Sequence, residues 1–396
     1  MRAINSIVKL AFSYLLLMSK FAYRSFIGFC YRVFAARLHI KSDRMVFYAG
    51  GYDGTHGNTY YLSEHAIAMG THQVYIMSNM PRLDRGRSKA KLIYANSPRA
   101  AYVLATAKYL VTDSVFPGYL NKRTGQVLLN TWHGTPIKHM GYHVESAVQE
   151  AMELRKHFLA ADILLFQNEY SKKTMCEAYE LKDEVKAVVI GSPRNSVFFK
   201  GGENLRRRLG FSGKRVYVYM PTWRGAGSKE TDKVFLDELI TNMRELDKFF
   251  SEMQEMDGKT VLFYKFHSFT YKKQTLPSFT SLLPFPVGLE TYKFLATVDC
   301  LITDYSSVLF DFALSRKEII LFPFDEERYI KDRGLYIGLE EMPFKKFYGT
   351  RELCEHIKSG GTFTVDGRYE SFRQEYCGCD TPDAVSRVME MLLRKK

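Results

Sequence analysis

The alternation of short apolar runs with helical stretches constrains the fold of this chain more than any other feature. Strand-like runs occupy residues 44–51, 72–78, 108–114, 126–132, 161–168 and 185–193, and helical patterns occupy 58–70, 97–107 and about 170–180. Strands separated by helices form parallel sheets, because each crossover helix returns the chain in the same direction. The first half of the chain therefore predicts a parallel α/β sheet.

The same alternation restarts after a Gly-rich, charged stretch at 199–214, which we interpret as a linker. Strands are expected at 215–223, 259–268, 299–307 and 317–325, and helices at 233–253, 288–298 and 308–316, with a basic amphipathic helix at 382–396. A chain of 396 residues is too long for one ordinary core. We therefore predict three parts: an N-terminal segment over 1–41 and two doubly wound α/β domains over 42–205 and 206–396.

The charge balance favours an anionic partner. Lys and Arg number 56 against 43 Asp and Glu, a net charge of +13. Nucleic acid, an acidic membrane surface, a phosphorylated substrate or a merely solubilising surface would each explain this surplus. Six scattered cysteines show no zinc-ligand spacing, so we expect a reducing compartment and no metal site. The sequence has no GxGxxG and no GxxxxGK[ST], which disfavours a dinucleotide enzyme and a P-loop NTPase.

The N-terminal segment is basic and rich in aromatic residues. It contains no acidic residue before Asp43, and no stretch reaches the roughly 18 uncharged apolar residues of a spanning helix. Basic residues continue past the first apolar run and no cleavage site follows it, so a signal peptide fits poorly. We expect an amphipathic segment lying on the cytoplasmic face of an anionic membrane. The alternative is a helix packed on the protein's own core.

Five polar clusters lie where predicted strands end. They are His133–Lys138, Gly191–Asn195, Pro221–Gly225, Lys265–Ser268 and Thr303–Ala313. Ligands of open parallel sheets bind at the carboxyl ends of the strands, so these clusters are the candidate site.

The residue types in these clusters are those of phosphate chemistry. Ser306 and Ser307 precede a predicted helix, where backbone N–H groups and hydroxyls attract phosphate, although either serine could simply cap that helix. Asp311 lies one helical turn after Ser307. His133 and His267 are candidates for proton transfer, since histidine titrates near neutral pH. The cations that could neutralise a diphosphate are Lys138, Arg194, Arg224 and Lys265.

The chain contains five motifs in this order: "NTWHGTPIKHMG", "GSPRN", "MPTWRG", "KFHS" and "ITDYSSVLFDFAL". Their order and approximate spacing resemble those of the CDP-glycerol glycerophosphotransferase family, whose enzymes build teichoic acids in bacteria. The resemblance covers residues 44–395 and is closest to the shorter, primase-like members. It implies a GT-B-like fold, two Rossmann-like domains facing a cleft, with the acceptor on the N-terminal domain and the CDP-alcohol on the C-terminal one. Where the family commonly has His-Pro, this chain has His267-Ser268.

The resemblance also implies roles for individual residues. His133 and His267 are the implied catalytic residues, and no metal or cofactor is implied. The implied donor-binding residues are Gly134, Thr135, Pro136, Ile137, Arg194, Pro221, Thr222, Lys265, Phe266, Ser306, Ser307 and Asp311.

The implied reaction moves glycerol phosphate or ribitol phosphate from CDP-glycerol or CDP-ribitol to a hydroxyl of a lipid-linked saccharide or growing polymer and releases CMP. The implied location is the cytoplasmic face of the bacterial membrane, with an anionic membrane surface and no nucleic acid as partners. Two other classes stay open. A nucleotide-sugar glycosyltransferase of the same fold would release a nucleoside diphosphate, and a non-catalytic basic membrane or nucleic-acid-binding protein would explain the charge but not the five clusters.

Overall fold

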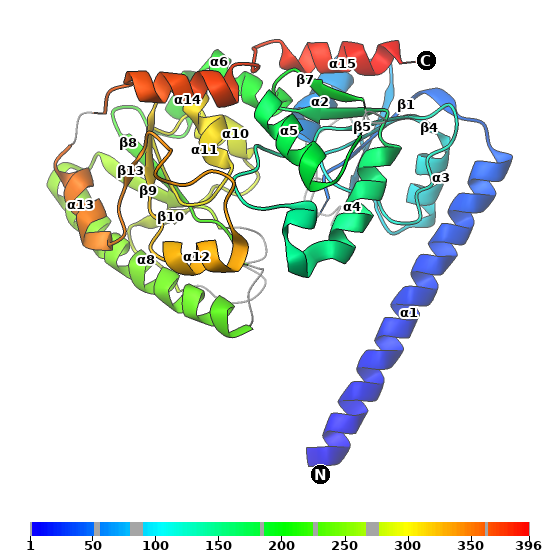
Figure 1. Ribbon diagram of the computed structural model, residues 1–396, viewed down its shortest axis with the longest axis horizontal. Coiled ribbons are helices and arrows are strands. Elements are labelled where there is room, and N and C mark those ends of the chain that lie inside the picture. The colour runs from blue at the N-terminus through cyan, green and yellow to red at the C-terminus, as the bar shows by residue number, and fades with distance from the viewer. Residues whose placement is uncertain are drawn as a thin grey trace. The chain divides into compact units, whose positions relative to one another are not determined.

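The computed structural model describes residues 2–50, 56–79, 90–182, 186–224, 229–266, 277–360 and 363–395, with the backbone alone for 2–17 and 229–232. The chain divides into two compact units. Unit 1 comprises Met1–His133, His157–Leu164 and Val388–Lys396, and unit 2 comprises Gly134–Lys156 and Leu165–Arg387. Figure 1 shows the helices and strands in the order of the chain.

The first sheet is parallel in every pair of strands whose register is described. Its strands are β1 (Lys41–Tyr48), β2 (Gln73–Ser78), β3 (Lys91–Tyr94), β4 (Ala107–Thr112), β5 (Val127–Asn130), β6 (Ile163–Phe166) and β7 (Ala187–Val189). They lie in the order β3-β2-β1-β4-β5-β6-β7. This is the doubly wound order, in which the chain reverses direction across the sheet between β1 and β4.

The second sheet repeats that topology. It contains β8 (Arg215–Met220), β9 (Thr260–Tyr264), β10 (Leu282–Pro284), β11 (Cys300–Thr303), β12 (Glu318–Leu321) and β13 (Lys345–Lys346). The order is β10-β9-β8-β11-β12-β13, and all pairs are parallel. The predicted pair of parallel, doubly wound sheets is therefore confirmed. Residues 205 and 206, the predicted boundary, lie between the last strand of one sheet and the first of the other.

The helices follow the sequence signals at several ends. They are α1 (Arg2–Arg37), α2 (Gly57–Met69), α3 (Pro98–Thr106), α4 (Val148–Ala160), α5 (Glu169–Ala178), α6 (Ser196–Lys200), α7 (Glu203–Arg208), α8 (Lys229–Asp257), α10 (Thr291–Leu295), α11 (Val308–Phe312), α12 (Glu326–Arg333), α13 (Thr350–Lys358), α14 (Gly367–Cys377) and α15 (Ala384–Arg394). Ser97 caps α3 by accepting a hydrogen bond from the Ala100 N–H, and Pro98 opens the helix, as predicted. Gly70 ends α2 in the left-handed conformation.

One local expectation was wrong. The stretch 199–214 is not an extended linker, because α7 and the end of α6 lie within it. Compact packing divides the chain differently from the two sheets, since 134–156 and 165–205 belong to unit 2 and the last residues to unit 1. The predicted domain bounds, 42–205 and 206–396, follow the sheets and stay a prediction.

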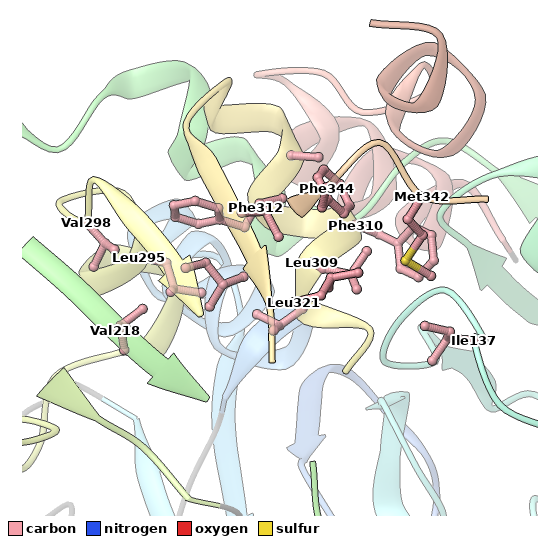
Figure 2. Packing of buried hydrophobic residues seen from close by; sticks show 14 of the residues in the cluster. Ile137, Val218, Leu295, Val298, Leu309, Phe310, Phe312, Leu321, Met342 and Phe344 are labelled. Carbon is pink, nitrogen blue, oxygen red and sulfur yellow. The ribbon is translucent and has the colours of Figure 1, made fainter. Parts of the chain in front are cut away.

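The core of unit 2 is built from aromatic and branched side chains around α11. Phe310 stacks on Phe372, with ring centroids 5.4 Å apart. Figure 2 shows Phe310 near Met342 and Phe344, and Leu309 near Leu321. Residues of one helix pack on partners from several segments, so this core fixes the position of the strand-to-helix turn that precedes α11.

The N-terminal helix α1 has two different faces. Its buried residues Ile27 and Tyr31 pack in the same core cluster as α3, with Phe34 against them. Large apolar side chains on the rest of its described part are exposed: Met18, Phe21, Tyr23, Phe26, Phe29 and Val33. Among the described residues, no helix has the length and apolar character required to cross a bilayer. The C-terminal helix α15 is different, because its apolar residues Val388, Met389 and Leu392 are buried.

Candidate active site

The turn after β5 is fixed by local hydrogen bonds. The Trp132 N–H donates to Oδ1 of Asn130 at 2.9 Å, and Trp132 adopts a φ of 49°, which non-glycine residues seldom do. Its indole is buried and packs edge-on against Phe158, with centroids 5.4 Å apart. A bulky residue keeps a positive φ only where the surrounding structure stabilises it, so the conformation of this turn is fixed by its contacts.

His133 follows in an exposed position with its ring orientation fixed. The ring lies 4.0 Å from the Trp132 indole, centroid to centroid, and its Nδ1 lies 2.8 Å from the carbonyl oxygen of Asp113. A carbonyl can only accept, so Nδ1 carries the proton in this contact. In the neutral ring the lone pair is then on Nε2, the tautomer that a general base requires.

Gly134 allows an unusually close approach of two polar side chains. Its φ is 148°, and a Cβ added there would lie 2.8 Å from Oγ of Ser307 and 3.1 Å from Nη2 of Arg194. Three residues, one from each of three predicted strand-end clusters, therefore meet within unit 2: Gly134, Arg194 and Ser307. Only glycine permits this approach, because any side chain would occupy the same space.

The three residues after Gly134 hold the loop. Thr135 is buried, and its hydroxyl accepts from Nδ2 of Asn168 at 3.0 Å. Pro136 accepts a hydrogen bond from the Tyr170 hydroxyl through its carbonyl. Ile137 is a member of the unit 2 core cluster and lies on its own loop in Figure 2. These side chains position the loop, and contact between them and a donor stays a prediction.

Arg194 and Asp311 form a buried ion pair. Nη2 of Arg194 lies 2.7 Å from Oδ2 of Asp311, and the side chains are 5% and 0% exposed. The same carboxylate accepts from the Tyr292 hydroxyl at 2.9 Å and from Nδ2 of Asn195 at 3.0 Å. The negative charge of Asp311 raises the pKa of Arg194 despite burial, which lowers it. With its oxygens engaged by three protein donors, Asp311 holds Arg194, and a hydrogen bond from Asp311 to a ligand hydroxyl stays a prediction.

The two serines before α11 differ in their hydrogen bonding. Oγ of Ser306 accepts a long 3.4 Å bond from the Val308 N–H. Ser307 is the residue before α11, yet its side chain makes no capping hydrogen bond. A pure capping role therefore does not account for Ser307, whose hydroxyl instead lies against Gly134.

Arg224 is committed to internal ion pairs. Its guanidinium lies 2.7 Å from Asp304 and 2.8 Å from Asp325, with only 7% of the side chain exposed. Its charge is thus balanced by two carboxylates, and the sequence-based idea that it neutralises a diphosphate loses support. Nearby, the backbone N–H of Thr222 donates to Asp304 at 2.9 Å, and the buried Thr222 hydroxyl has no hydrogen-bond partner in the described chain. Pro221, just before it, is buried.

Two lysines of the predicted set have no ion pair among the described residues. Lys138 pairs by backbone with Leu335, and burial followed by the charge of Arg333 lowers its pKa to about 8. Lys265 lies over the Phe285 ring, 5.3 Å from its centroid, and burial lowers its pKa.

Phe266 is buried, and His267 lies outside the described residues. Within the described chain, no group of three acidic, His or Cys side chains has the arrangement of a metal site.

Sequence reasoning missed the polar residues that support these loops. Asp380, Gln167 and Tyr292 contribute buried hydrogen bonds to the site, and none was predicted. Gln167 and Asn168 directly follow β6 and carried the strand-end signal. Asp380 lies between two C-terminal helices, where nothing in the sequence marks it.

Comparison with known proteins gives a consistent result. The family described as CDP-glycerol:poly(glycerophosphate) glycerophosphotransferase matches residues 30–394. A teichoic acid poly(glycerol phosphate) polymerase of Bacillus spizizenii is 27% identical over 310 residues, which are 74% of this chain and 76% of that protein. The corresponding polymerase of Staphylococcus epidermidis is 25% identical over 76% of this chain, which spans only 44% of that relative's length.

The wall teichoic acid polymerase TagF shares the fold. Its structure matches with a TM-score of 0.78 at 21% sequence identity, covering 96% of both chains. The resemblance expected from the motifs is thereby confirmed. The chain belongs to the CDP-glycerol:poly(glycerophosphate) glycerophosphotransferase family and is a transferase of phosphorus-containing groups.

Proposed function

We propose that the chain transfers glycerol phosphate, or ribitol phosphate, from a CDP-alcohol to a hydroxyl of a lipid-linked saccharide or growing teichoic-acid-type polymer, releasing CMP. Family membership supports the donor class. The observation that carries the proposal is the convergence of Arg194 and Ser307 on Gly134. A guanidinium and a hydroxyl packed against the same loop position provide two hydrogen-bond donors for phosphate oxygens.

In the proposed reaction, His133 is the general base. The acceptor hydroxyl gives its proton to Nε2 while its oxygen bonds to the β-phosphorus of the CDP-alcohol. The bond from that phosphorus to the bridging oxygen breaks, and its electron pair leaves with CMP. The Asp113 carbonyl keeps the proton on Nδ1 and fixes the ring. His133 and Gly134 are consecutive, so the base directly precedes the phosphate-binding loop in the chain.

Cationic and hydroxyl groups stabilise the charge on the diphosphate. Arg194, Ser307 and Lys265 donate to phosphate oxygens, and the buried Thr222 hydroxyl gains a partner when donor binds. Charge-assisted bonds of this kind are stronger in a partly buried site than in water. His267 has the same role on the grounds of family resemblance.

For one hydroxyl of the acceptor we propose a small cavity in unit 1, which has room for about one water-sized group. It lies at the carboxyl ends of β4 and β5 and is lined in part by Thr112, Ser114, Asn130 and His157. Asp113, which holds His133, comes between two of these residues in the chain. Hydroxyl and amide side chains suit the hydroxyls of a saccharide.

The membrane surface is the proposed location. The exposed Phe21, Phe26 and Phe29 of α1, interspersed with Lys20 and Arg24, suit insertion among anionic lipid headgroups. The acceptor would be presented from the same surface. We place the protein on the cytoplasmic face, where anionic lipids and CDP-alcohols are both available.

The decisive experiment measures CMP release by the purified chain with CDP-glycerol and with CDP-ribitol, in the presence of a lipid-linked acceptor analogue. The proposal predicts CMP from one or both donors and its loss in His133→Ala and His267→Ala. His72→Ala is the control, because His72 precedes β2 at the opposite, amino end of the strand. An inactive wild type with both donors would contradict the proposal and direct a screen toward sugar nucleotides.

A further inference from the structure

Asp380 is a buried carboxylate that the reaction does not use directly. It lies between α14 and α15 and is 6% exposed. The neighbouring loop comes so close that a Cβ on Gly191 would lie 2.6 Å from the Cα of Asp380. We propose that Asp380 is a positioning residue for the phosphotransfer site, holding the loops of Arg194 and Gly134 through two hydrogen-bonded arms. This inference rests on the proposed function.

The first arm leads from Asp380 to Arg194. Oδ1 of Asp380 accepts from the Ser192 N–H at 2.7 Å and from Nδ2 of Asn195 at 3.1 Å. The same amide nitrogen donates to Oδ1 of Asp311 at 3.0 Å, and Asp311 pairs with Arg194. Asn195 is therefore clamped between two carboxylates, and the backbone on both sides of Arg194 is fixed.

The second arm leads from Asp380 to the loop of Gly134. Oδ2 of Asp380 accepts from Nε2 of Gln167 at 3.2 Å. The other end of that side chain, Oε1, accepts from the Thr135 hydroxyl at 3.4 Å. Thr135 adjoins Gly134, against which Arg194 and Ser307 lie. The two arms thus start at one carboxylate and end at Arg194 and at the residue next to Gly134, which lie close together.

The direction of these hydrogen bonds requires the ionised carboxylate. Three groups face Asp380 in the two arms, and all three donate hydrogen bonds to its carboxylate. They are the Ser192 N–H and the side-chain amides of Asn195 and Gln167. A protonated acid would have to donate from one oxygen and would oppose one of these donors. The arms are therefore complete only when Asp380 carries its charge.

The surroundings bring the pKa of Asp380 close to neutral pH. Burial, and then the negative charge of Asp311, raises the pKa of Asp380 to about 7, while the hydrogen bonds from Ser192, Asn195 and Gln167 oppose the rise. The other charged or titratable groups that interact with it are Arg194 and the thiols of Cys377 and Cys379. The positioned form of the site accordingly becomes more populated as the pH rises through about 7.

A reciprocal exchange of side chains tests the second arm. Asp380→Asn preserves the size of the side chain and can still accept from Ser192 and Asn195, but it places an amide against the Gln167 amide. Gln167→Glu places two carboxylates together. The double variant Asp380→Asn with Gln167→Glu reverses the pair, so that the introduced amide at 380 donates to the introduced carboxylate at 167. Asp366→Asn is the matched control, because Asp366 caps α14 outside this network.

CMP release and thermal unfolding are measured for all four variants between pH 5.5 and 9. Each single exchange is expected to lower kcat roughly 10- to 100-fold, as misplacement of catalytic groups by about 1 Å does, and the double variant to recover at least a tenfold part of the loss. Asp380→Asn should also remove the component of the wild-type pH profile near pH 7. Asp366→Asn should keep the wild-type kcat. Wild-type kcat in Asp380→Asn or in Gln167→Glu would overturn the proposal, as would a folded double variant no more active than either of these two single variants.

A measurement independent of activity separates this inference from the proposed function. Hydrogen–deuterium exchange of peptides covering 130–140 and 189–197 should be faster in Asp380→Asn than in wild type and should slow again in the double variant. Unchanged exchange in both peptides would reject the positioning role even if the wild type proves active. Failure of the wild type to release CMP with normal exchange behaviour would reject the function instead. If Asp380→Asn does not fold, recovery of folding and exchange protection in the double variant supports the pair, and its absence contradicts it.

Discussion

Nη2 of Arg194 and Oδ2 of Asp311 lie 2.7 Å apart in the interior of unit 2, although 117 residues separate them in the chain. The pair joins the loop after β7 to the first turn of α11. The pair holds the Arg194 guanidinium beside Gly134. A buried charge pair adds little net stability, but the loss of one partner leaves an uncompensated charge.

Arg194→Ala should therefore destabilise the fold by about 3–5 kcal/mol, since it strands the Asp311 carboxylate. Urea unfolding measures this loss. The exposed pair Arg351–Glu355, 91% and 64% exposed, is the control, and Arg351→Ala should cost at most about 0.5 kcal/mol. Equal losses in the two variants would contradict the assignment of a buried pair.

Gly134→Ala should abolish activity while largely preserving secondary structure. The added Cβ would lie 2.8 Å from the Ser307 hydroxyl and 3.1 Å from Arg194, so both must move. Gly201→Ala is the matched control, because Gly201 also has a positive φ but open space around it. CMP release and circular dichroism distinguish the two effects. Full activity in Gly134→Ala would show that the close approach is dispensable.

His133→Ala should lower kcat by roughly 10²–10⁴ with little change in KM for the CDP-alcohol, because general-base catalysis acts in the transition state. His133→Gln should not restore activity, since an amide cannot take up the acceptor proton. Initial rates over a range of donor concentrations give both constants. An effect confined to KM would assign His133 to donor binding instead.

Replacement of Lys138 by methionine should have opposite effects on stability near pH 7 and on donor binding. The pKa of Lys138 is lowered to about 8, below the ordinary value of 10.5, so the folded state disfavours the ammonium form. The linked stability is present above pH 10.5 and is lost as the pH falls through 8. Lys138→Met should therefore stabilise the protein near pH 7 and remove this pH dependence, while raising KM for the anionic donor. Melting temperatures between pH 6 and 11 test the first effect, and a variant less stable than wild type at pH 7 would refute it.

Phe21→Ser with Phe29→Ser should weaken binding to vesicles of anionic lipid several-fold without altering the melting temperature, because both side chains are exposed, at 69% and 56%. Co-sedimentation at two salt concentrations measures the binding. Val287→Ser, at 96% exposure on unit 2, is the control for removal of an exposed apolar side chain. Unchanged sedimentation of the double variant would remove the membrane role from this face of α1.

The sequence was sufficient for features that depend on neighbouring residues. Alternating apolar runs and helical periods identified the two parallel sheets, and Ser97-Pro98 marked the start of α3, because periodicity and capping are local. The ordered motifs around His133, Arg194 and Ser307 identified the family. Boundaries were less accurate where short helices replaced the expected linker at 199–214, since charged and Gly-rich composition does not exclude one or two helical turns.

Only the tertiary structure shows which polar and charged side chains form hydrogen bonds and ion pairs with one another. Arg194 and Arg224 are alike in sequence as strand-end arginines. In the structure Arg224 pairs with two carboxylates, Asp304 and Asp325, whereas Arg194 pairs with one, Asp311, and also lies beside Gly134 and Ser307. Asp380 carried no signal because its partners, Gln167 and Asn195, lie 213 and 185 residues away. Local patterns determine helices, strands and turns, whereas the protonation and orientation of buried polar groups depend on contacts that form only when distant segments pack together.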